Sequence, residues 1–220
     1  MIDKDLDLVN FVEVNRSKNN YFVRNESGKL TIGLITVDNQ PKDNLTIVTD
    51  KVQYIGSNKG EWGGELVAKW PEGTTDKLIN DNIVALIPEQ DDLYVFTGLA
   101  HLTSNRGAVY KILNFETKPK VEKVTLLPQA PNVVLRNKQQ ENVLEFVIIT
   151  SSGVTLLEPE YDDLKVLDTK LFWGGLYPNS AVQTTDGFLI GMRSGIASFS
   201  LTEHAGWGPR TVSNVKYFTK

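Results

Sequence analysis

Residues 179–201 read NSAVQTTDGFLIGMRSGIASFSL, and this stretch decides the fold. It holds two short apolar runs, Phe188–Met192 and Ile196–Phe199, with a polar turn ending in Gly195 between them. The pair Asp186-Gly187 precedes the first run, and Asp-Gly beside apolar runs is a strong β-hairpin signal because both positions tolerate positive φ. The stretch therefore predicts consecutive antiparallel strands joined by tight turns.

Glycines between pairs of apolar runs recur along the whole chain at intervals of 36, 43, 46 and 42 residues: Gly28, Gly64, Gly107, Gly153 and Gly195. A period of forty-odd residues is typical of β-propeller blades, each of which is a sheet of four strands. The 220 residues divide into five such units of about 44 residues. The sequence therefore predicts an all-β protein, a small β-propeller with five blades that forms one domain over residues 1–220.

Strand positions follow from the apolar runs and the turns between them. The clearest repeat has four expected strands, Ile83–Ile87, Leu93–Phe96, Ala108–Leu113 and Val121–Leu127. Residues 98–106 are expected to form a long loop, and Thr74–Asn80 at most a turn or two of helix. Leu8–Val14 is expected to pair beside Val212–Phe218, so that both ends of the chain share one blade.

Composition restricts the possible partners and cellular locations. The net charge is −4 and the pI is about 5.3, which argues against a nucleic-acid partner and favours a basic protein partner. No run reaches the roughly 18 apolar residues that a membrane span needs, so no membrane association is expected. Cysteine is absent and the first residues lack the pattern of a signal peptide, so we expect a cytoplasmic monomer, or a periplasmic one if a signal peptide was removed.

The chain carries little that would support catalysis. His101 and His204 are the two histidines, and neither belongs to an HxxxH or HExxH motif. The expected inner strands Ile83–Ile87, Val133–Leu135 and Ser180–Gln183 contain no Asp, Glu or His that could line a catalytic axis. We therefore expect no catalytic residue, no metal and no cofactor, and a protein that is not an enzyme.

Candidate binding residues stand in the expected loops. Loops between second and third strands emerge on the same end of a propeller as loops between blades, and Trp, Tyr and Arg are the types enriched at interface hot spots. This argument predicts one partner-binding rim formed by Trp62, His101, Arg106, Trp173, Tyr177 and Arg193. For the two tryptophans, packing between blades is the alternative.

The stretch NSAVQTTDGFLIGMRSGIASFSL after WGGLYP, and IVALIPEQDDLYVFTGLAHLTSNRGAVYKI earlier in the chain, resemble blades of uncharacterised bacterial propellers of the WD40-like and YncE-like kind. By type, a small acidic cysteine-free binder also resembles bacterial immunity proteins, which implies a cognate toxin domain as the partner. The favoured function is therefore non-enzymatic binding and neutralisation of a toxin. A sugar- or lactone-processing propeller enzyme and a scaffold or sensor module remain as alternatives.

Overall fold

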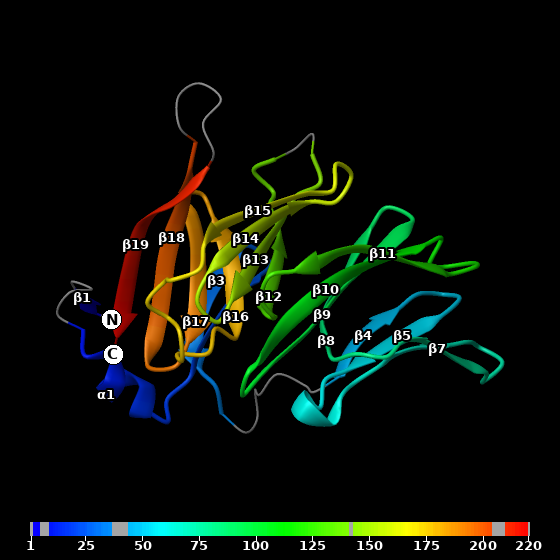
Figure 1. Ribbon diagram of the computed structural model, residues 1–220, viewed down its shortest axis with the longest axis horizontal. Coiled ribbons are helices and arrows are strands. Elements are labelled where there is room, and N and C mark those ends of the chain that lie inside the picture. The colour runs from blue at the N-terminus through cyan, green and yellow to red at the C-terminus, as the bar shows by residue number, and fades with distance from the viewer. Residues whose placement is uncertain (1, 5–8, 37–43, 141–142, 204–209, 220) are drawn as a thin grey trace. The chain divides into compact units, whose positions relative to one another are not determined.

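The structure, a computed structural model, describes residues 2–4, 9–36, 44–140, 143–203 and 210–219 (Figure 1). The described residues form five antiparallel sheets, and the predicted fold class, an all-β protein of the small five-bladed propeller type, is confirmed. The chain divides into two compact units, residues 41–131 and residues 1–40 with 132–220. No described helix is long and apolar enough to cross a membrane.

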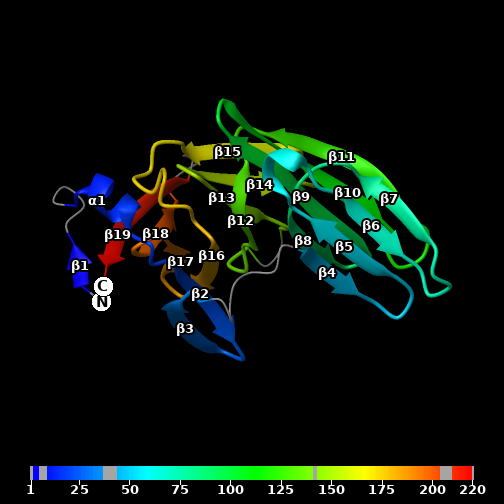
Figure 2. The same cartoon turned by 90° about the horizontal axis from the view of Figure 1, so that it is seen from below.

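The unit of residues 41–131 contains two sheets of four sequential strands (Figure 2). The first sheet consists of β4 (Asn44–Val48), β5 (Gln53–Ser57), β6 (Leu66–Lys69) and β7 (Thr75–Ile79). The second consists of β8 (Ile83–Glu89), β9 (Asp92–His101), β10 (Ser104–Leu113) and β11 (Lys120–Leu127). Their shared core contains Tyr54, Leu66, Leu93, Val95 and Ile112, all without solvent exposure.

The other unit contains the remaining three sheets. One consists of β12 (Pro131–Arg136), β13 (Phe146–Thr150), β14 (Val154–Glu158) and β15 (Asp163–Asp168). The next consists of β16 (Ser180–Thr184), β17 (Gly187–Met192), β18 (Gly195–Thr202) and β19 (Thr211–Thr219), with β1 (Ile2–Lys4) added at the edge. The third is a hairpin of β2 (Tyr21–Glu26) and β3 (Lys29–Leu34).

Both ends of the chain meet in one sheet, as expected, but the N-terminal strand is Ile2–Lys4 and not Leu8–Val14. β1 pairs with β19 in the register Ile2↔Thr219 and Lys4↔Tyr217. The expected strand Leu8–Val14 is wrong where the structure describes it, because Phe11–Arg16 forms the short helix α1. Asn10 caps this helix by accepting a hydrogen bond from the backbone N–H of Val12 at 3.2 Å. Leu8 lies outside the described residues.

One further local prediction is wrong, and one segment with an open assignment is a strand. Residues 98–106, expected to form a loop, belong largely to β9 and β10, which continue to the pair His101↔Ser104. The prediction failed because the exposed polar residues of this hairpin have the composition of a loop, although they belong to paired strands. Thr74–Asn80, expected to hold at most a turn or two of helix, contains the strand β7, whose pairing with β6 decides its conformation.

The first repeat supplies two strands instead of four. The β2–β3 hairpin packs on β16, β17 and β18, and the hydroxyl of Ser180 accepts a hydrogen bond from the N–H of Val23 at 2.9 Å. The backbone of the hairpin approaches β17 closely at Gly191, where a Cβ would lie 2.5 Å from the carbonyl oxygen of Tyr21 and 2.8 Å from Cα of Phe22. Gly191 is therefore required for the hairpin to seat against this sheet.

Candidate functional site

One buried asparagine holds the loop that carries Trp62 in place. Gly60–Trp62 forms a short 3-10 helix, η3. Asn82, 1% exposed, accepts a hydrogen bond from the N–H of Lys59 at 3.0 Å and donates one to the carbonyl of Gly60 at 2.7 Å. The indole of Trp62 nevertheless remains 83% exposed. The loop thus holds a large apolar side chain in solvent on a backbone that has little freedom.

Two side-chain pairs lie in this loop and on the segments next to it. Nδ1 of His101, at the end of β9, lies 3.3 Å from the carboxylate of Glu61 in η3. Nη1 of Arg106, on β10, lies 2.7 Å from the carboxylate of Asp81, and this hydrogen bond and the charge of Asp81 raise the pKa of the guanidinium. Leu102, at the tip of the β9–β10 hairpin, is 92% exposed.

We call these six residues the Trp62 surface: Glu61, Trp62, Asp81, His101, Leu102 and Arg106. They all lie in the unit of residues 41–131, and three of them, Trp62, His101 and Arg106, belong to the predicted rim. The prediction missed Glu61 and Asp81, which are defined by their charge partners and not by any local motif. Leu102 could have been found, since it is an apolar residue among polar neighbours at a hairpin tip.

The predicted role of Trp173 in partner binding is wrong. Its side chain has no solvent exposure and belongs to the core of the unit that holds both chain ends. The indole N–H donates to the carbonyl of Thr150 at 3.1 Å, and its ring packs edge-on against Phe172. The packing alternative therefore holds for Trp173, because its polar atom is satisfied internally and its apolar surface is covered.

Tyr177 and Arg193 lie together in the same unit as Trp173. The guanidinium of Arg193 stands 4.5 Å from the ring centroid of Tyr177, which is 56% exposed. Nη1 of Arg193 also donates to the carbonyl and side-chain oxygens of Asn15 in α1, at 2.7 and 2.9 Å. Arg193 thus joins the helix to the β17–β18 turn, a structural role that the sequence did not indicate.

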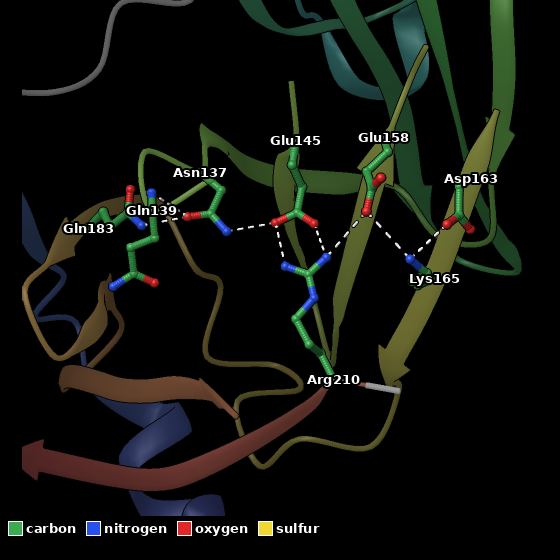
Figure 3. Close-up of polar contacts among 8 residues, drawn as sticks. All are labelled: Asn137, Gln139, Glu145, Glu158, Asp163, Lys165, Gln183 and Arg210. Carbon is green, nitrogen blue, oxygen red and sulfur yellow. Dashed lines mark hydrogen bonds and ion pairs between the residues drawn. The ribbon is translucent and has the colours of Figure 1, made fainter. Parts of the chain in front are cut away.

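The sequence did not predict a network of buried and partly buried polar side chains in this unit (Figure 3). Glu145 has no solvent exposure, and its carboxylate accepts hydrogen bonds from both terminal nitrogens of Arg210. Nη2 of Arg210 also lies 3.4 Å from Oε1 of Glu158. Asn137 donates to Glu145 at 2.6 Å and accepts from Gln183 at 2.6 Å. The network joins the sheet of β12–β15 to β16 and to the residue that precedes β19.

The chemistry of this network is that of a structural ion pair. Burial lowers the pKa of Arg210, but the hydrogen bond and charge of Glu145 and the charge of Glu158 outweigh burial and raise it. Both carboxylate oxygens of Glu145 are occupied by protein donors, which leaves neither of them for a substrate. Among the described residues, no three His, Cys, Asp or Glu side chains are grouped so that they could hold a metal ion.

Comparison with known proteins gives no family for the chain. No family model matches, and no curated protein matches either. One similar solved structure is a GH43 glycoside hydrolase whose engineered active site has endo-xylanase and exo-arabinofuranosidase activity (11% identity, 78% of this chain and 40% of that chain, TM-score 0.42). Another is the extracellular domain of a one-component system from B. thetaiotaomicron (13% identity, 87% of this chain and 26% of that chain, TM-score 0.47). A third comes from a nidogen/laminin complex (9% identity, 90% of this chain and 97% of that chain, TM-score 0.42). The chain thus spans less than half the length of the first two.

Proposed function

We propose that this chain is a non-enzymatic protein-binding propeller whose partner docks on the Trp62 surface. The observation that carries the proposal is the exposure of Trp62, 83%, on a loop that Asn82 holds in place. An exposed indole contributes little to folding, whereas burial in a partner's pocket would remove most of its apolar surface from water. Because the loop is already ordered, docking costs little conformational entropy.

The surroundings of Trp62 fit the same proposal. The Glu61–His101 and Arg106–Asp81 pairs supply polar groups to this surface, and Leu102 supplies a second exposed apolar side chain. An apolar anchor within a polar border is the usual composition of an interface hot spot. The partner is therefore expected to be a protein with an apolar pocket for the indole. The net charge of −4 favours a basic one, and a toxin domain neutralised by this chain is the specific case to test first.

The test begins with affinity capture from the native host and identification of the captured protein by mass spectrometry. The purified partner is then titrated calorimetrically with the wild-type chain, with Trp62→Ala and with Tyr161→Ala. Tyr161 is a matched control because it is an exposed aromatic residue, 68% exposed, in the other unit. We expect Trp62→Ala to weaken binding by about 2 kcal/mol or more, roughly thirtyfold, and Tyr161→Ala to leave affinity unchanged.

An unchanged affinity for Trp62→Ala, with the fold intact by circular dichroism, would contradict the proposal. For the toxin case, the identified partner is expressed in cells together with each variant. Protection that fails with Trp62→Ala and persists with Tyr161→Ala supports neutralisation through this surface. Growth that does not depend on the chain at all would exclude a toxin as the partner.

A further inference from the structure

A groove of about 560 Å³ lies within the unit that holds both chain ends, between the β2–β3 hairpin and the strands β12 and β16. Its apolar wall includes Leu135 from β12 and Ala181 and Val182 from β16. The volume falls in the range of sites that take small organic molecules. Figure 2 shows the hairpin beside β16 and β17. The hydroxyl of Ser180 on β16 and the close approach at Gly191 on β17 hold it there.

Three cationic side chains line this groove. Arg24 comes from β2, Arg136 ends β12, and Lys138 follows two residues later. No Asp or Glu is among the described residues that line it, although Glu26 pairs with Nε of Arg24 at 3.1 Å from the adjoining end of the hairpin. Counted over the described residues, the three cations and Glu26 leave this groove with an excess of positive charge, which in a chain with a net charge of −4 is an exception that favours an anion.

Buried groups position this cationic wall. The N–H of Lys138 donates to the side-chain oxygen of Gln183 at 2.8 Å, and Gln183 donates in turn to Asn137. Asn137 is 2% exposed and is bonded to the buried Glu145 (Figure 3). On the opposite wall, the guanidinium of Arg24 stands 4.5 Å from the ring centroid of Phe22. The groove thus has fixed walls, which lowers the entropy cost of binding a ligand there.

We propose that this groove binds a small organic anion with two or more carboxylate or phosphate groups and an apolar part. Guanidinium groups pair with carboxylate and phosphate oxygens through two parallel hydrogen bonds, and the lysine adds a point charge. The apolar part of the ligand would pack on Leu135 and Val182. This site lies in a different unit from the Trp62 surface, so the proposal of an anion site does not depend on the proposal of a protein partner.

Citrate and inorganic pyrophosphate, a tricarboxylate and a phosphate probe, are titrated calorimetrically into the full chain. The test variant is Arg136→Gln with Lys138→Gln, in which both changed side chains are exposed. The control variant is Lys51→Gln with Lys118→Gln, which removes the same charge from exposed positions of the other unit. We expect one probe molecule per chain, at least about tenfold weaker binding in the test variant, and affinity within about twofold of wild type in the control.

Backbone amide shifts of Lys138 and Gln183 on titration would locate the bound probe at the groove. Equal losses of affinity in the two double variants would overturn the proposal, because net charge would then explain binding. Failure of both probes to bind at millimolar concentration would also overturn it. So would binding of a hexaglutamate peptide without binding of either small probe, since the ligand would then be an acidic chain segment.

Discussion

Two tryptophans that the sequence did not distinguish have opposite environments in the structure. Trp62 stands between Glu61 and Gly63-Gly64 and is exposed, whereas Trp173 follows Leu171-Phe172 and is buried. The sequence left packing and binding open for both. The immediate neighbours hold the signal that separates them, because an apolar run indicates a core and an acidic, glycine-rich loop indicates a surface.

This difference gives a prediction at the residue scale. Trp173→Ala leaves a cavity among the aromatic rings and removes the hydrogen bond from the indole to the carbonyl of Thr150, so it should lower the free energy of unfolding by about 3–5 kcal/mol. Trp62→Ala should change that free energy by less than about 0.5 kcal/mol. Urea unfolding followed by fluorescence and circular dichroism measures both. Equal losses of stability would contradict the assignment of Trp62 to the surface.

At the scale of elements, the strands were predictable and some of their associations were not. The apolar runs locate β8, β14 and β17 because buried strands need consecutive or alternating apolar residues. The packing of the β2–β3 hairpin on β16–β18 depends instead on a glycine about 170 residues further along the chain, Gly191. A glycine that permits a close backbone approach cannot be told from a turn glycine in the sequence alone.

Gly191 therefore supplies the prediction at this scale. Gly191→Ala would place a methyl group against the backbone of Tyr21 and Phe22, which cannot yield as a flexible side chain can. We expect a loss of about 1–3 kcal/mol in the free energy of unfolding and faster amide exchange in β2. Gly174→Ala is the matched control, because its nearest heavy atom lies at 3.7 Å. Similar stabilities for the two variants would show that the hairpin does not seat at Gly191.

At the scale of the whole molecule, the glycine interval was sufficient to predict the fold class but not the sites. Each blade is a local unit, so the repeat appears as a regular spacing in the sequence. The polar contacts of the sites join residues that are far apart, such as Arg106 with Asp81, 25 residues away, and Arg210 with Glu145, 65 residues away. Pairings of that kind leave no local pattern, and only the assembled sheets bring the partners together.

In each unit of the molecule, a buried tyrosine with a raised pKa should make the fold sensitive to alkaline pH. Burial raises the pKa of Tyr54 from 10.0 to about 12, and burial with the nearby Tyr21 does the same for Tyr217. Tyr54 donates to the carbonyl of Phe115 at 2.5 Å, and Tyr217 donates to that of Arg193 at 3.3 Å. The unfolded chain releases both protons near pH 10, before the folded one does, so their contribution to stability is complete below pH 10 and declines as pH rises through 12.

We expect the urea midpoint to fall between pH 10 and 12, less steeply in Tyr54→Phe and in Tyr217→Phe than in wild type. Tyr161→Phe, which changes an exposed tyrosine, should follow the wild-type curve. If all four proteins lose stability in parallel over this range, the alkaline transition arises from other groups and the two phenols are not its source.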